Sequence, residues 1–255
     1  MAAISFLNTR PLIHGLDEAG DLDLVYEVPA GLAAGLGEGR FDVALLPVID
    51  YQRLDDLVIV PAGGIACDGP TLTVRLFSDR PIEQITTLAC DTDSHTSVAL
   101  ARIILAERYG IRPRFVDLDR THPARPDAML LIGDKVVCEE PAGLEHQLDL
   151  GQAWKELTGL PFVFAVWTAR AGVDLGDLPQ RLEHAKRQGL SHLSEIIARH
   201  AVPRGWPAGV ALQYLTIYLN FDITPRHMEA IRRFHDLAHK HGVLTEPPKP
   251  LRVYG

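Results

Sequence analysis

The sequence predicts an α/β protein of two lobes, with a cleft between them and two hinge crossovers. Apolar strand candidates alternate with helical segments through residue 170, a pattern typical of sheets covered by helices. After residue 178 the apolar periodicity is helical. Two breaks in this order, at residues 77–87 and 164–174, separate a middle segment from both ends of the chain. Two such crossings predict a hinged pair of lobes.

The composition is that of an ordinary globular protein and argues against several classes of function. The chain has 255 residues, 47% of them hydrophobic, and a net charge of −8, which suits one large domain or two smaller ones. No run of Lys and Arg is long enough to indicate a nucleic-acid partner, and no apolar stretch is long enough for a membrane span. The first residues lack a signal-peptide pattern. We therefore expect a cytoplasmic monomer or homodimer.

Neither the cysteines nor the histidines indicate a metal site. The three cysteines are odd in number and form no CxxC pair, which argues against a disulfide framework or a zinc ribbon. His235 and His239 have the helical spacing of some metal ligands, but no HExxH motif accompanies them. We expect a solvated helix end there, no metal and no cofactor.

The predicted strands are short and apolar, and several are apolar at every position, as strands buried on both faces should be. This alternation of strands and helices favours parallel sheets. In chain order the predicted strands are Ala3–Leu7, Leu24–Pro29, Val43–Leu46, Leu57–Val60, Thr71–Phe77, Thr87–Cys90, Arg114–Leu118, Ala128–Ile132 and Phe162–Trp167.

The predicted helices follow the strands, and the last of them has clear boundaries. Thr224 is expected to cap it, Pro225 suits its first position, and Gly242 follows its end. In chain order the predicted helices are Pro11–Ala19, Gly31–Gly37, Thr96–Tyr109, Gly151–Thr158, Leu178–Ala201, Val210–Leu219 and Pro225–His241. From the two crossings we expect a larger lobe of residues 1–85 and 167–255, and a smaller lobe of residues 86–166.

Three hydroxyl residues gather at the start of one predicted helix. Ser94, Thr96 and Ser97 follow a short strand directly. Unpaired backbone N–H groups and the partial positive charge of a helix start bind anions, and hydroxyls add donors. One hydroxyl could instead cap the helix while the others face water. The stretch alone leaves both interpretations open.

Three further strand ends have a similar design. Asn8 follows the first strand, Leu46 and Pro47 end the third, and Gly133 and Asp134 end the strand at 128–132. In α/β proteins ligands bind at the carboxyl ends of strands. Capping by Asn8 and a turn at Gly133 are the simpler alternatives. With two such ends in each predicted lobe, we expect all four to face one cleft.

Five stretches resemble MqnA-type chorismate dehydratases of the futalosine route to menaquinone. They are "ISFLNTRPLIHGL", "FDVALLPVIDY", "DSHTSVALARIIL", "LLIGDKVV" and "DLGQAWKELTGLPFVFAVW". The resemblance covers most of residues 3–170. It implies the type II periplasmic-binding-protein fold and a hydro-lyase that converts chorismate into 3-[(1-carboxyvinyl)oxy]benzoate. Where the family more often has a serine after the proline of the second stretch, this chain has Val48, which argues against a side-chain role there and leaves backbone N–H groups as the available donors.

The resemblance also implies roles for the residues at the strand ends. Asn8 and Ser94 are expected to be catalytic. Substrate binding is expected at Leu46, Pro47, His95, Thr96, Ser97, Gly133 and Asp134. No general base is apparent in these stretches: His95 is a candidate, and Asp134 would repel a dianion unless it is protonated or turned away. We therefore expect substrate-assisted elimination, with the enolpyruvyl carboxylate as the proton acceptor.

Three other functions are weighed against this one. A non-catalytic binding protein of the same fold would take a small carboxylate without converting it. The related lyase that acts later in the pathway carries a histidine where this chain has Gly133. A ligand-sensing regulator would need a DNA-binding element, and no basic helix-turn-helix pattern is apparent.

Overall fold

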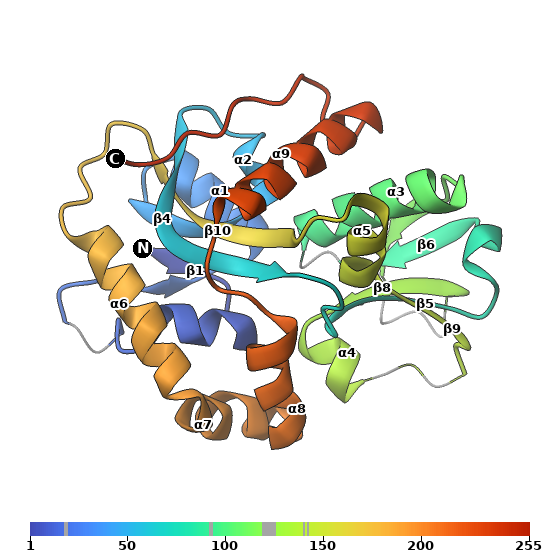
Figure 1. Cartoon of the computed structure of the whole chain (residues 1–255), viewed down its shortest axis with the longest axis horizontal. Coiled ribbons are helices and arrows are strands. Elements are labelled where there is room, and N and C mark those ends of the chain that lie inside the picture. The colour runs from blue at the N-terminus through green and yellow to red at the C-terminus, as the bar shows by residue number, and fades with distance from the viewer. Residues whose placement is uncertain (18–19, 92–93, 119–125, 140, 142) are drawn as a thin grey trace.

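The computed structural model shows two α/β lobes, each built on one five-stranded sheet (Figure 1). It describes residues 1–17, 20–91, 94–118, 126–139, 141 and 143–255. The fold class predicted from the sequence is confirmed. Of the helix predicted at 11–19, the last two residues lie outside the described residues.

The first sheet has the strand order β2-β1-β3-β10-β4. Its strands are Val25–Tyr26 (β2), Ala2–Ala3 (β1), Val43–Pro47 (β3), Phe162–Arg170 (β10) and Leu57–Cys67 (β4). β1 pairs in parallel with β2 and β3, whereas β10 runs antiparallel to β3 and β4. Every residue of β3 is buried, as expected for an apolar strand with helices on both sides.

The second sheet has the strand order β7-β6-β8-β5-β9. Its strands are Arg114–Asp117 (β7), Thr87–Cys90 (β6), Ala128–Ile132 (β8), Val74–Ser78 (β5) and His146–Asp149 (β9). β6 pairs in parallel with β7 and β8, and β5 runs antiparallel to β8 and β9.

Both sheets are therefore mixed, and the expectation of parallel sheets holds only for β1, β2 and β3 and for β6, β7 and β8. The strands that run against their neighbours, β5 and β10, are those by which the chain enters a sheet after crossing from the other lobe. The first crossing occupies residues 68–73, earlier than the expected 77–87, because β5 already belongs to the second sheet. The second crossing lies between α5 (Leu150–Thr158) and β10.

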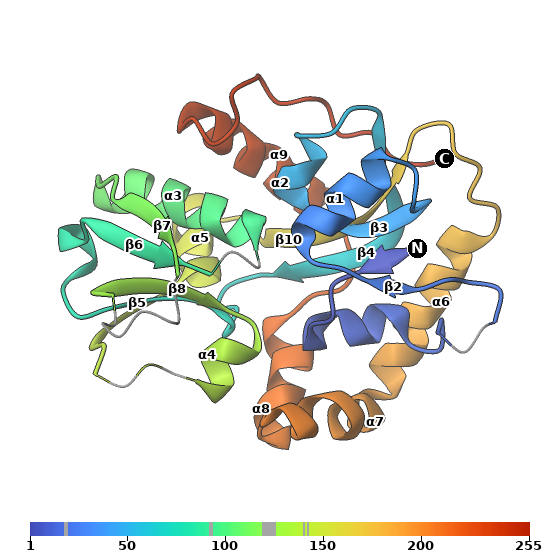
Figure 2. The ribbon, with the colours of Figure 1, turned by 180° about the vertical axis from the view of Figure 1, so that it is seen from behind.

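Helices cover both faces of the first sheet (Figures 1 and 2). Alternate residues of β3 serve the two faces. Ala44 and Leu46 pack with α1 (Pro29–Gly37), α2 (Val48–Tyr51) and α9 (Pro225–Lys240). Val43 and Leu45 pack with the 3-10 helix η1 (Leu7–Ile13) and with α6 (Leu178–Ser191).

The remaining helices complete the two lobes. In the second lobe, α3 and α5 pack against each other, and α4 follows β8. In the first lobe, the predicted helix at 178–201 is broken after α6, and the predicted helix at 210–219 ends in a π-helical turn. The bounds are Ile82–Gln84 (η2), His95–Tyr109 (α3), Asp134–Cys138 (α4), Leu193–Ile196 (α7), Ile197–Ala201 (η3), Val202–Arg204 (η4), Ala208–Gln213 (α8) and Tyr214–Tyr218 (η5).

The start of the chain differs from its prediction. The predicted strand at 3–7 ends after Ala3, and η1 begins at Leu7. Asn8 therefore lies inside the 3-10 helix, and the residue at its N-cap is Phe6, which makes no side-chain cap bond. The capping alternative for Asn8 does not hold, and its amide is free for other contacts.

Asp149 ties the first crossing to the start of α5. Its carboxylate accepts hydrogen bonds from the backbone N–H groups of Thr71 and Leu72 at 2.9 to 3.0 Å. It also caps α5 by accepting from Gly151 and Gln152 at 3.0 and 3.1 Å. Leu72 has a φ of +67°, a strained value for a residue other than glycine, and the bond to Asp149 holds it there.

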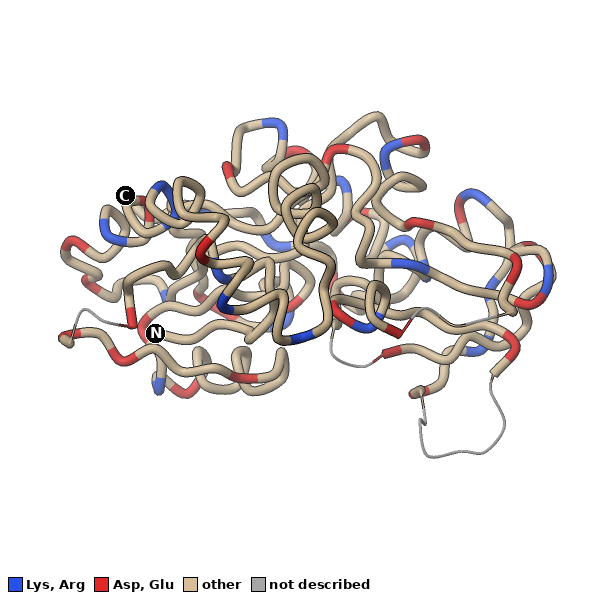
Figure 3. The backbone as a smooth tube through the Cα atoms, turned by 90° about the horizontal axis from the view of Figure 1, so that it is seen from below, with Lys and Arg blue, Asp and Glu red and all other residues tan. Residues whose placement is uncertain are grey.

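Charged residues of both signs are interspersed along the described backbone of both lobes (Figure 3). This distribution agrees with the absence of long basic runs from the sequence. Within the described residues, no helix combines the length and the hydropathy that crossing a lipid bilayer requires.

Candidate active site

The candidate site is a cavity between the two lobes. The cavity has a volume of about 60 Å³. Both lobes contribute to it: η1 and β3 on one side, and the starts of β5, α3 and α4 on the other. The lining residues are Ile4, Phe6, Asn8, Thr9, Pro29, Leu45, Pro47, Ile65, Thr71, Thr73, Val74, Ser94, Ser97, Ile132, Gly133, Phe164, Ala165, Tyr214 and Leu219.

The start of α3 forms one polar wall. Ser94 caps the helix by accepting a hydrogen bond from the N–H of Ser97 at 3.2 Å. Its own hydroxyl donates to the Ser97 hydroxyl at 2.8 Å. No described residue accepts the Ser97 hydroxyl hydrogen, so Ser97 can donate into the cavity. Capping and ligand binding are therefore compatible at this helix start.

The other two residues of this stretch face elsewhere. The Thr96 hydroxyl is buried and donates to the carbonyl of Phe164 at 3.2 Å. His95 Nδ1 lies 2.8 Å from the Asp50 carboxylate, which is 1% exposed and also accepts from Arg53 at 2.9 Å. Because α2 carries Asp50 and α3 carries His95, this contact joins the two lobes outside the cavity.

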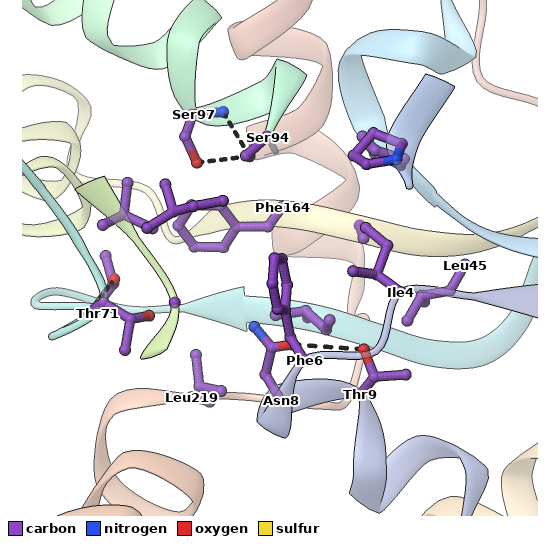
Figure 4. Close-up of a pocket in the computed structure, with 18 of the residues that line it drawn as sticks. Ile4, Phe6, Asn8, Thr9, Leu45, Thr71, Ser94, Ser97, Phe164 and Leu219 are labelled. Carbon is purple, nitrogen blue, oxygen red and sulfur yellow. Dashed lines mark hydrogen bonds between the residues drawn. The ribbon is translucent and has the colours of Figure 1, made fainter. Parts of the chain in front are cut away.

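Asn8 stands on the opposite side of the cavity from Ser94 and Ser97, with the rings of Phe6 and Phe164 between them (Figure 4). Its amide Nδ2 donates to the hydroxyl of Tyr214 at 3.1 Å. The Thr73 hydroxyl donates to the same Tyr214 oxygen at 3.0 Å. Burial raises the pKa of Tyr214, so this phenol stays protonated and is a donor rather than a base.

The other two predicted strand ends meet the cavity in part. Pro47 lines it, whereas Leu46 packs in the core behind. Gly133 lines it with a φ of +62° and a ψ of −139°, a conformation that only glycine adopts without strain. Any other residue at this position would be strained on this backbone.

Asp134 does not line the cavity and binds the other lobe. It accepts a hydrogen bond from the indole N–H of Trp206 at 2.8 Å. Arg204 lies 3.5 Å from the same carboxylate. This is a second contact between the lobes, and it turns the negative charge of Asp134 away from the site.

Among the described residues, no acidic, basic or histidine side chain lines the cavity. Its polar groups are hydroxyls, an amide and backbone groups. A separate hollow between α3, β7 and the end of α9 differs from the cavity in that ionisable side chains line it, namely Arg53, Arg102, His95, His241 and Asp117. Arg53 and Arg102 of that hollow attract anions, although Arg53 is paired with Asp50, whereas the cavity offers neutral donors and a helix start.

Four polar residues of the cavity were not predicted from the sequence: Thr9, next to Asn8 in η1, and Thr71, Thr73 and Tyr214. Thr71 and Thr73 lie on the first crossing, which we expected further along the chain. Tyr214 lies in the helical third of the sequence, where no strand end or motif marks it. A polar side chain within an otherwise apolar helical face was the available signal, but it identifies no partner.

The chain is similar to proteins of one pathway. A family model described as "Menaquinone biosynthesis" matches residues 1–240. A chorismate dehydratase of Thermus thermophilus is 32% identical over 77% of this chain and 79% of that protein. The 1,4-dihydroxy-6-naphtoate synthase of the same organism is 26% identical over 95% of this chain and 93% of that protein.

Two solved structures support the fold assignment. A protein of Archaeoglobus fulgidus has a TM-score of 0.75 at 17% identity, over 95% of this chain and 97% of that one. The alkanesulfonate-binding protein SsuA of Xanthomonas axonopodis pv. citri, bound to MOPS, has a TM-score of 0.69 at 14% identity, over 97% of this chain and 94% of that one. These likenesses extend to the fold alone, which is that of the type II periplasmic binding proteins.

Proposed function

The chain belongs to the menaquinone-biosynthesis family, and from that premise we propose that it is a chorismate dehydratase, a hydro-lyase. A relative named chorismate dehydratase, 32% identical over most of both chains, supports this activity over that of the later-acting lyase. The substrate carries a ring carboxylate and an enolpyruvyl carboxylate. The product is 3-[(1-carboxyvinyl)oxy]benzoate, as the sequence resemblance implies.

One observation carries the mechanism: the cavity has hydrogen-bond donors on opposing walls and no ionisable acid or base side chain among the described residues except the protonated Tyr214. A dianion can be held there by the start of α3 and by neutral donors. A general base must be close enough to abstract a proton, and no such side chain is available in the described lining. The base is therefore a group of the substrate.

The elimination balances without a protein acid or base. The enolpyruvyl carboxylate removes the C3 proton, and the C3–H electron pair forms the new C3=C4 double bond. The C4–O pair leaves with the oxygen, which receives that same proton and departs as water. The ring becomes aromatic, which supplies the driving force. The protein orients the substrate and excludes water.

Each wall has a separate task. Ser97, ordered by Ser94 and adjoining the start of α3, binds one carboxylate. Asn8 fixes the enolpyruvyl ether and the departing hydroxyl on the opposite side. The rings of Phe6 and Phe164 enclose the substrate between these walls. The roles of the predicted site residues are predictions, which a structure with bound substrate tests.

The experiment is the conversion of chorismate by the purified protein, followed by chromatography of the benzoate product. Wild-type protein should form product. Asn8→Asp should lower turnover about 100-fold, because a new charge about 6 Å from a substrate carboxylate costs about 3 kcal/mol at an effective dielectric constant of about 20. The exposed Asn220 gives the matched control Asn220→Asp, which should retain wild-type turnover.

Two outcomes contradict the proposal. Binding of chorismate without conversion would indicate a binding protein of the same fold. Full activity of Asn8→Asp would remove Asn8 from the mechanism. The cytoplasmic location and the monomeric or dimeric state stay predictions, which cell fractionation and analytical ultracentrifugation test.

A further inference from the structure

Hydrogen bonds from both lobes converge on the hydroxyl of Tyr214. This residue begins η5 of the first lobe and is 2% exposed. Asn8, also of the first lobe, donates to its oxygen at 3.1 Å. Thr73, which directly precedes β5 of the second lobe, donates at 3.0 Å. The two donors come from different lobes and meet on one atom.

These two bonds leave the hydroxyl hydrogen of Tyr214 unused. A phenol oxygen has one hydrogen to donate and accepts through its lone pairs. Both hydrogen bonds of this oxygen to described residues are accepted bonds, and no described residue accepts its hydrogen. Tyr214 lines the cavity, so the hydrogen is available to a bound molecule. A buried donor without a partner is costly, and a ligand oxygen would remove that cost.

We propose that Tyr214 is a catalytic residue, which donates its hydroxyl hydrogen to the departing hydroxyl of the substrate and is oriented for this by Thr73. The proposal rests on the proposed function. Asn8 places Tyr214 at the side of the cavity where the leaving group lies. Ser97 serves the opposite side, where its hydroxyl donates to a carboxylate.

In this step Tyr214 keeps its proton. Negative charge grows on the C4 oxygen as the C4–O bond breaks, until that oxygen receives the proton taken from C3. The Tyr214 hydrogen bond strengthens as this charge grows, and it therefore lowers the barrier more than it stabilises the bound substrate. Donation from Thr73 and Asn8 polarises the phenol and makes its hydrogen a better donor.

The position of Thr73 couples this donor to lobe closure. Thr73 is attached to the second lobe, because its carbonyl accepts from the N–H of Gly133 at 2.9 Å. If the lobes separate, Tyr214 loses the bond from Thr73 and retains that from Asn8. The closed arrangement is thus the one in which the phenol is held by two bonds with its hydrogen directed into the cavity.

The packing of the Tyr214 ring can be kept while its hydroxyl is removed. The ring lies against Trp206, with centroids 5.2 Å apart and an interplanar angle of 30°. Tyr214→Phe retains this contact. Tyr218, at the end of the same turn, makes no hydrogen bond through its hydroxyl to any described residue, and Tyr218→Phe is the matched control.

The experiment compares steady-state kinetics on chorismate for wild type, Tyr214→Phe, Tyr218→Phe, Thr73→Val and Thr73→Ser. Tyr214→Phe should lower kcat about 10- to 100-fold with KM changed less than about threefold, the pattern of a bond made in the transition state. Thr73→Val should lower kcat less, and Thr73→Ser should restore it because the hydroxyl returns. Tyr218→Phe should match wild type, and thermal denaturation should show all variants folded.

The outcomes separate this inference from the proposed function. If wild-type protein forms no product, the proposed function fails and Tyr214 loses its assignment with it. If wild type is active and Tyr214→Phe retains full kcat, only the assignment of Tyr214 fails. A rise in KM alone would likewise contradict it, because Tyr214 would then bind substrate without aiding the reaction. Failure of Thr73→Ser to restore kcat would contradict the orienting role of Thr73.

Discussion

Replacement of Asp149 by alanine should weaken the protein at the junction of its two lobes. The Asp149 carboxylate accepts four backbone N–H groups, two from the first crossing and two from the start of α5. Loss of a helix cap costs about 1 kcal/mol. Each of the two bonds to the crossing contributes about 1 kcal/mol at a partly exposed site. The variant should therefore lose about 3 kcal/mol of unfolding free energy.

The effect should extend to activity, because the same crossing carries Thr71 and Thr73 into the cavity. Without Asp149, the strained φ of +67° at Leu72 loses the bond that holds it, and the crossing can relax. Turnover should fall along with stability. Asp149→Asn retains one acceptor oxygen and should show a smaller loss of both.

The assay is equilibrium unfolding in urea, followed by circular dichroism. Asp177 provides a matched control, since it occupies the N-cap of α6 without a side-chain cap bond. Asp177→Ala should change the unfolding free energy by less than about 0.5 kcal/mol. If Asp149→Ala also stays within about 0.5 kcal/mol of wild type, the four bonds do not hold the crossing and this reasoning is refuted.

Three further predictions follow from packing, protonation and lobe contact. A Cβ at Gly189 would lie 2.2 Å from the carbonyl oxygen of Pro11, so Gly189→Ala should lower the free energy of unfolding in urea by about 2 kcal/mol. The control Gly209→Ala in α8, where a Cβ would meet open space, should not lower it. Equal stabilities of the two variants would contradict the close packing of α6 on η1. Burial lowers the pKa of His235 from 6.5 to about 4, so the neutral imidazole contributes about 3 kcal/mol to the free energy of unfolding above pH 6.5, and this contribution is lost as the pH falls toward 4. Urea midpoints of wild type and His235→Gln, measured between pH 7.5 and pH 4.5, test this. If the wild-type midpoint falls no more steeply with pH than that of the variant, the prediction is wrong. Trp206→Phe removes the hydrogen bond from the indole to Asp134 between the lobes. It should raise KM for chorismate about three- to tenfold with little change in kcat, because closing the lobes on the substrate then costs more free energy. An unchanged KM would mean that this contact does not support lobe closure.

Much of the fold is determined by local patterns in the sequence. The strand at 87–90 and the strand at 128–132 have the predicted bounds, because continuous apolar runs between turn residues leave few alternatives. The direction of β5 and β10 could not be predicted in this way. It depends on where the chain crosses between lobes, and the crossing at 68–73 is fixed by the distant carboxylate of Asp149.

The site shows the same division between local and distant information. Ser94 and Ser97 were predicted because a helix start has a local sequence signal, and both line the cavity. Tyr214 was not predicted, because its contacts are with Asn8, 206 residues earlier, and with Thr73 on the other lobe. His95 and Asp134 were expected in the site from their position in the motifs. Their partners, Asp50 and Trp206, place both side chains in contacts between the lobes instead.

The proposed mechanism requires that the dianionic substrate binds to the neutral donors of the cavity and not to the arginines of the neighbouring hollow. The direct measurement is a crystal structure of the protein with the benzoate product bound. We expect one product carboxylate within hydrogen-bond distance of the Ser97 hydroxyl and the start of α3, with Asn8 and Tyr214 at the other end of the molecule. A product molecule held by Arg53 and Arg102, with the cavity between the lobes empty, would contradict the account.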